Sequence, residues 1–216
     1  MSTLAEELFL LADDRVTGRP LIDHTHLDLG LGGALLLDLV LRGRITLVDF
    51  HVRAVVLTDT GDEMLDDALS SIAREGGPHE PDYWVRRLAR SAYHEVRGQL
   101  VAEGVLRRDD HKLLGVIPVH QTPQADTGVE HELTDHLHDA VVLGHPATAR
   151  TAALAALVLA VGLEHHLFPR RDQRAIRRRI AELAGGQWVV ESVVRAINAT
   201  NAALGIVPFD DSTEWG

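Results

Sequence analysis

Apolar residues recur at helical spacing along most of the chain. In residues 3–12 the apolar positions include 4, 8 and 11, which is the spacing of a helix with one buried face. Comparable patterns predict helices over residues 60–72, 82–106, 130–142, 147–163, 170–183 and 188–204. The polar stretch 13–28 contains Gly18 and Pro20 and is predicted to be a loop. The pattern as a whole indicates a mainly α-helical protein.

Two segments are apolar on nearly every side. Residues 33–41 are interrupted only by Asp38, and residues 151–163 contain no charged side chain. A helix of this kind is buried in the core. Thirteen residues fall short of the roughly 20 that cross a bilayer, so residues 151–163 are predicted to form a core helix.

Short β-branched runs interrupt the helical pattern. Residues 45–47 and 52–57 predict a β-hairpin, and residues 113–119 predict a further strand after the polar turn 108–112. The fold class expected is mainly α, with one or two short β-hairpins. A single domain is predicted over residues 1–209, followed by a frayed acidic tail at 210–216.

Composition narrows the chemistry. The chain of 216 residues has no cysteine, which excludes disulfides, thiol nucleophiles and cysteine-ligated zinc. Its net charge of −11 argues against a nucleic-acid partner. The first residues lack the basic region of a secretory signal, so a cytoplasmic location is expected.

Sequence motifs for catalysis or cofactors are weak. The glycines at 30, 32 and 33 lack the spacing of a dinucleotide loop and the Gly-Lys-Ser/Thr of a Walker loop. Close helix packing is the favoured interpretation, and a phosphate loop is the alternative.

The histidine pairs at 24 and 26 and at 136 and 138 lack the HExxH pattern, so surface histidines are favoured over a metal site. Neither catalytic residues nor cofactors are predicted, and an unrecognised enzyme is an open alternative.

Arginines gather on two predicted helices. Residues 170–179 hold six arginines and one aspartate. A solvated amphipathic helix with Ile176 and Ile180 turned inward is favoured there, and a face for phosphate, anionic lipid or nucleic acid is the alternative. The second group consists of Arg86, Arg87, Arg90 and Arg97 on the helix 82–106.

Several stretches resemble, in the same order, the Golgi phosphoprotein 3 family. They are LAEELFLL at 4–11, LGGALLLDLVLRGRI at 31–45, TGDEMLDDALSSI at 60–72, VAEGVL at 101–106, RTAALAALVL at 150–159 and the helix 188–203. The resemblance covers about residues 4–205. It implies a hydrophobic helix bundle wrapped by amphipathic helices. It also implies a non-enzymatic peripheral membrane adaptor, since eukaryotic members bind phosphatidylinositol 4-phosphate and hold glycosyltransferases in the Golgi.

The resemblance also implies a lipid site. The family surrounds the phosphate with a tryptophan and three basic residues, and counting without gaps places these on Asp23, Gly32, Arg90 and Tyr93. The lipid- or phosphate-binding residues predicted here are Arg86, Arg87, Arg90 and Tyr93, on a face near Lys112. The implied partners are an anionic phospholipid headgroup and an unidentified protein, on the inner face of the membrane. The oligomeric state stays open.

A competing interpretation is a winged-helix DNA-binding regulator. The order helix, glycine, basic residue, hairpin occurs at 33–57 and again at 90–119. Only the second helix carries enough arginines to read DNA, and the negative net charge disfavours it.

Overall fold

The computed structural model describes residues 2–14, 17–75, 77–106, 127–185 and 188–203. These residues form the helices α1 (Leu4–Ala12), α2 (His24–Leu41), α3 (Glu63–Arg74), α4 (Pro81–Ala102), α5 (Thr127–Val141), α6 (Ala149–Ala160), α7 (Glu164–Leu167), α8 (Gln173–Ala184) and α9 (Trp188–Ala203). They also form two antiparallel hairpins, β1 (Asp13–Asp14) with β2 (Arg19–Pro20) and β3 (Ile45–Val48) with β4 (His51–Ala54). The predicted mainly α class is confirmed.

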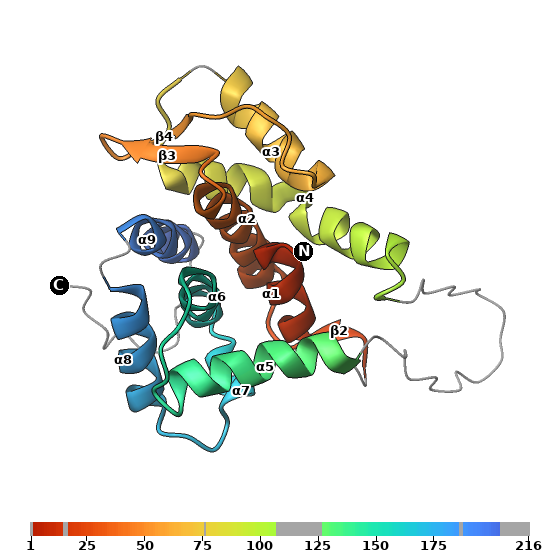
Figure 1. Ribbon diagram of the computed structural model, residues 1–216, viewed down its shortest axis with the longest axis vertical. Coiled ribbons are helices and arrows are strands. Elements are labelled where there is room, and N and C mark those ends of the chain that lie inside the picture. Colours follow the sequence, from red (N-terminus) through yellow and green to blue (C-terminus); the bar gives the residue numbers. More distant parts are fainter. Residues whose placement is uncertain (1, 15–16, 76, 107–126, 186–187, 204–216) are drawn as a thin grey trace, which may run out of the picture.

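Helix α2 runs through the middle of the bundle and packs against α1, α4, α6 and α9 (Figure 1). It begins at His24, so the prediction of loop up to residue 28 and helix only from 33 was wrong. The Asp23 carboxylate accepts hydrogen bonds from the backbone N–H groups of Thr25 and His26. This N-cap starts the helix within a polar segment that lacks an apolar periodicity.

The glycines of α2 allow close packing, as the favoured interpretation held. A Cβ atom on Gly32 would lie 2.5 Å from the Val85 carbonyl oxygen and 2.8 Å from the Ala89 nitrogen, both in the backbone of α4. A Cβ atom on Gly33 would lie 2.8 Å from the Ile197 side chain of α9. At Gly32 only glycine fits, because the α4 backbone cannot yield, whereas at Gly33 a larger residue would require the Ile197 side chain to move.

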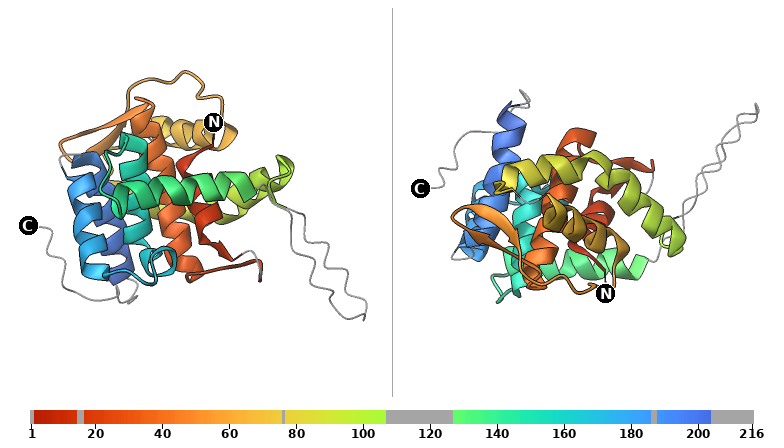
Figure 2. Two further views of the ribbon diagram at one scale, coloured as in Figure 1. Left: turned by 60° about the horizontal axis from the view of Figure 1, so that its bottom comes forward. Right: turned by 90° about the horizontal axis from the view of Figure 1, so that it is seen from above.

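Helix α6 lies beside α2 and is buried along most of its length, as predicted for residues 151–163. Helices α5 and α8 pack against its outer side (Figure 2). Ile176 and Ile180 of α8 are buried, as expected. Arg177 is also turned inward, where its Nε donates a 3.2 Å hydrogen bond to the buried Glu164 of α7. The arginines of α8 therefore do not all belong to one solvated face.

The hairpins differ in part from the prediction. The pair β1–β2 falls in the segment predicted to be loop. In the second hairpin, β4 ends at Ala54, so residues 55–57, which were predicted to be strand, lie outside it. The predicted strand 113–119, the turn 108–112 and the tail 210–216 lie outside the described residues.

Within the described ranges, no helix is both long enough and apolar enough to cross a bilayer.

Candidate functional site

Helix α4 presents three of the four predicted site residues to solvent. Its inner side buries Val85, Ala89 and Val96 against the core, because these positions recur at three- and four-residue spacing. Arg86, Arg87 and Arg90 occupy the opposite side and are exposed. The helix thus places the guanidinium groups on its outer surface.

The three arginines differ in how their charge is balanced. Arg86 Nη2 lies 2.7 Å from Asp82 Oδ2, one turn earlier on the same helix. Arg87 Nη2 lies 3.1 Å from Glu75 Oε2, and its guanidinium carbon is 5.9 Å from the centre of the Trp84 ring.

Arg90 has no ion-pair partner in the part of the chain that the structure describes. A phosphate group approaching α4 therefore meets one uncompensated arginine, flanked by two that are held in exposed ion pairs. Pairs of this kind contribute about 0–1 kcal/mol, so they can exchange a carboxylate for a phosphate at small cost.

Tyr93 lies one turn beyond Arg90 and belongs to an aromatic cluster. Its ring centre is 5.2 Å from that of Phe9 in α1 and 5.0 Å from that of His24 at the start of α2. The side chain is half-buried and joins three helices. The structure therefore places Tyr93 on the border of the arginine face, with its ring packed inward.

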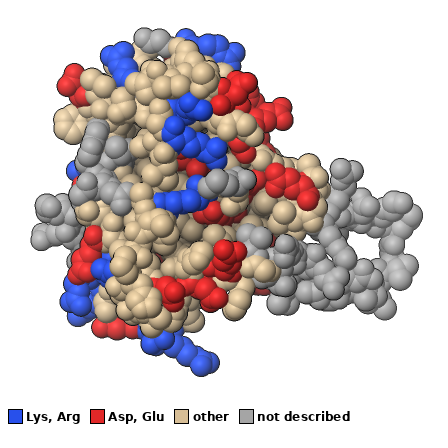
Figure 3. All heavy atoms as spheres, viewed as in Figure 1, with Lys and Arg blue, Asp and Glu red and all other residues tan. Residues whose placement is uncertain are grey.

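The hairpin β3–β4 lies against the beginning of α4. The Val52 N–H donates a 2.8 Å hydrogen bond to the His79 carbonyl, and the His79 ring stacks on Tyr83 at 4.0 Å. Arg53 is exposed on β4. Figure 3 shows arginine atoms among uncharged ones, with acidic atoms beside them, over the upper part of the molecule where this hairpin and α3 lie.

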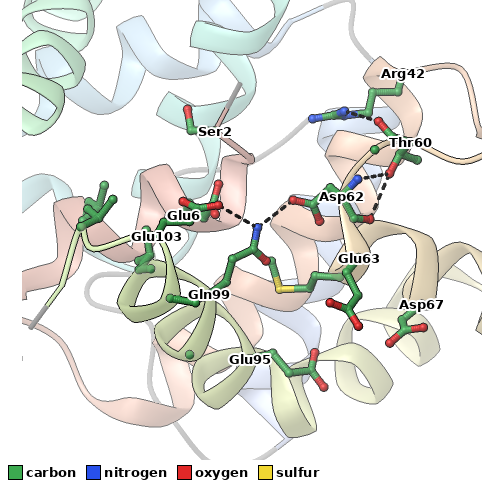
Figure 4. A pocket seen from close by; sticks show the side chains of 17 residues that line it. Ser2, Glu6, Arg42, Thr60, Asp62, Glu63, Asp67, Glu95, Gln99 and Glu103 are labelled. Atoms are coloured by element: carbon green, nitrogen blue, oxygen red, sulfur yellow. Dashed lines mark hydrogen bonds between the residues drawn. The ribbon is translucent and has the colours of Figure 1, made fainter. Parts of the chain in front are cut away.

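A second surface feature is a hollow of about 1130 Å³ between α1, α3 and the end of α4. Its lining includes the carboxylates of Glu6, Asp62, Glu63, Asp67, Glu95 and Glu103, and one arginine, Arg42. The Gln99 side-chain amide donates to Asp62 at 3.0 Å and to Glu103 at 3.5 Å (Figure 4). We call this feature the acidic hollow.

Electrostatics make the acidic hollow unsuitable for a phosphate. Burial raises the pKa of the Glu6 carboxyl, and the nearby charges of Glu103 and Asp62 raise it further. An anionic ligand would add repulsion to a site that already disfavours negative charge. Sequence reasoning missed this hollow, because its carboxylates come from three separate segments of the chain.

The described residues contain no group of three or more histidines and carboxylates arranged to hold a metal ion.

The comparison with protein families agrees with this architecture. The model of the Golgi phosphoprotein 3 (GPP34) family matches residues 4–200, which is most of the chain. The chain belongs to the Golgi phosphoprotein 3 family. No curated protein matches it significantly.

The family's phosphate pocket is largely absent at the positions where the ungapped count placed it. Asp23 is the α2 N-cap, and its second oxygen bonds His26 Nδ1. Burial alone would raise the pKa of Asp23, but the hydrogen bonds from His26 lower it, so this position holds a negative charge.

The second pocket position is Gly32, which lies against the α4 backbone where no side chain fits. Only Arg90 is a cation at its expected place in this Golgi phosphoprotein 3 family member.

Proposed function

We propose that this protein is a non-enzymatic peripheral membrane adaptor that binds anionic phospholipid headgroups through the outer face of α4. The observation that carries the proposal is Arg90, an exposed arginine with no ion pair among the described residues, beside Arg86 and Arg87. Family membership supports the class of function. The adaptor role and the location on the inner face of the membrane rest on the family alone.

The proposal favours general anionic lipid over one phosphoinositide. A single arginine contributes about 1.5–3 kcal/mol through a charge-assisted hydrogen bond, whereas micromolar affinity needs about 8 kcal/mol. The Asp23 carboxylate and Gly32 supply no further cation. Several arginines acting on a charged surface, each worth about 1 kcal/mol, fit these residues better than a closed headgroup pocket.

Vesicle flotation tests the proposal. The full chain is mixed with vesicles of phosphatidylcholine alone, with added phosphatidylglycerol, or with added phosphatidylinositol 4-phosphate. We expect binding to both anionic vesicles and none to the neutral one. The double variant Arg87→Ala, Arg90→Ala should weaken binding by roughly 30-fold, since each arginine contributes about 1 kcal/mol.

Two exposed arginines of α8 supply the matched control. The variant Arg174→Ala, Arg178→Ala removes the same charge from a helix on another side of the bundle. We expect it to bind as the wild type does. Loss of binding in this variant alone would assign the lipid face to α8, and absence of wild-type binding to every vesicle would reject the proposed function.

A further inference from the structure

Exposed apolar side chains are concentrated around the hairpin β3–β4. Seven large hydrophobic residues are exposed in the described part of the chain, and six of them fall within residues 41–57. These six are Leu41, Val48, Phe50, Val55, Val56 and Leu57. Such a concentration on the surface marks an interaction site.

The tip of this hairpin holds an aromatic residue in an unfavourable backbone conformation. Val48 pairs with His51, so the turn consists of Asp49 and Phe50, whose φ angles are +49° and +63°. Two-residue turns with positive φ favour Asn-Gly or Asp-Gly, because a Cβ atom disfavours this region.

Phe50 is nevertheless 74% exposed. The fold therefore carries a strained phenylalanine that gains little from burial in the monomer, which is the pattern of a functional contact.

The charges around the tip differ in sign from those of the whole protein. Residues 41–57 contain three arginines and one aspartate, in a chain of net charge −11. Arg53 is exposed on β4, on the same outward face as Val48, and has no ion pair among the described residues. Apolar side chains beside arginines match an anionic lipid surface. The apolar side chains can enter the acyl region, and the arginines can contact the phosphates.

The hairpin is a protruding and anchored element. Figures 1 and 2 show it extending from the edge of the helix bundle. Its strand β4 is held next to the turn by the Val52–His79 backbone bond of 2.8 Å, and the entry to β3 is held by Arg44 Nη2, which donates to the Asp59 carbonyl at 3.1 Å. A protrusion fixed in this way can enter a lipid surface, which adapts to its shape, without further ordering of the chain.

We propose that the tip of the β3–β4 hairpin inserts Val48 and Phe50 into the interfacial layer of an anionic membrane, with Arg53 at the lipid phosphates. The proposal rests on the proposed lipid-binding function and adds the apolar contact to it. It concerns the hairpin β3–β4 and not the predicted turn at 108–112, which lies outside the described residues.

The variant Phe50→Gly tests the proposal without endangering the fold, because glycine suits the positive φ angle. Its control is Leu143→Gly, which removes the one exposed large apolar residue of the described chain outside residues 41–57. In flotation with phosphatidylglycerol vesicles, we expect Phe50→Gly to weaken binding about tenfold and Leu143→Gly to leave it unchanged.

Insertion is measured directly with a single labelled cysteine, since the chain has none of its own. An environment-sensitive dye on Val48→Cys should brighten with anionic vesicles and be quenched by nitroxides on the acyl chains. The same dye on Leu143→Cys should do neither.

The outcomes separate the two proposals. Wild-type binding with an unchanged Phe50→Gly variant and an unquenched dye overturns insertion and leaves the α4 face in place. Absence of wild-type binding to any vesicle overturns both. Insertion is also overturned if the wild type is a dimer and Phe50→Gly is a monomer that binds vesicles as the wild type does. The exposed apolar residues of 41–57 would then form a contact between copies of the chain.

Discussion

Arg150 of α6 donates a 2.9 Å hydrogen bond from Nη1 to Oδ1 of Asp38, which is fully buried in α2. The other oxygen of Asp38 accepts the backbone N–H of Leu4 at the start of α1. The same guanidinium also contacts Glu7 Oε1 at 2.9 Å. One carboxylate and one arginine therefore hold together the beginning of α1, the last turn of α2 and the beginning of α6.

Replacing Asp38 with alanine should lower the free energy of unfolding by about 3–5 kcal/mol, because Arg150 and the Leu4 N–H lose their buried acceptor. Urea denaturation followed by circular dichroism measures the change. The control is Asp82→Ala, which breaks an exposed pair with Arg86 and should cost less than about 1 kcal/mol. Equal effects of the two substitutions would contradict a structural role for the buried network.

Two glycines on neighbouring helices should respond to alanine with opposite signs. Gly32→Ala places a Cβ atom 2.5 Å from the Val85 carbonyl oxygen, so α2 and α4 must separate at a cost of about 1–3 kcal/mol. Gly98→Ala, within α4, meets no atom within 4 Å and should stabilise the protein by about 0.5–1 kcal/mol. Thermal unfolding of both variants makes the comparison, and stabilisation by Gly32→Ala would disprove the close helix contact.

The ionisation of Glu6 should make the protein less stable as pH rises. Burial raises the folded-state pKa of this carboxyl above its ordinary value of 4.5. The folded state therefore binds the proton more tightly than the unfolded state, and stability is lost as pH rises from 4.5 through the raised pKa.

Glu6→Gln removes that ionisation and keeps an oxygen for the Thr3 N–H. Its urea midpoint should exceed that of the wild type at pH 8, and the difference should shrink toward pH 4. If the urea midpoints of Glu6→Gln and the wild type differed by the same amount at all pH values, the ionisation of Glu6 would not be the cause of the difference.

Phe50→Gly should raise stability while it weakens vesicle binding. Relief of the positive φ angle at Phe50 is worth about 1–2 kcal/mol, and the added freedom of glycine in the unfolded chain offsets part of it. We expect a net gain of roughly 0.5–1 kcal/mol in urea denaturation. A loss of stability would show that the Phe50 ring makes contacts needed by the fold.

The core could be predicted from the sequence because its signal is local. Apolar residues at helical spacing gave α1, α3 and α6 with nearly correct bounds. The all-round apolar segments are buried over 33–39 and at most positions of 151–163. The order of motifs indicated the family, which the family model matches over residues 4–200. The start of α2 was wrong because a polar N-cap at Asp23 has no apolar periodicity to reveal it.

The candidate surfaces depended on tertiary structure. The sequence supplied the arginines of α4, but only the fold paired Arg87 with Glu75 and left Arg90 without a partner among the described residues. In the sequence, Phe50 is one more apolar residue near a predicted strand. Its exposure follows from the register Val48↔His51, which places Phe50 in the turn. Local periodicity determines which side chains a helix buries, whereas the charge and exposure of a surface depend on residues that are distant in sequence and brought together by packing.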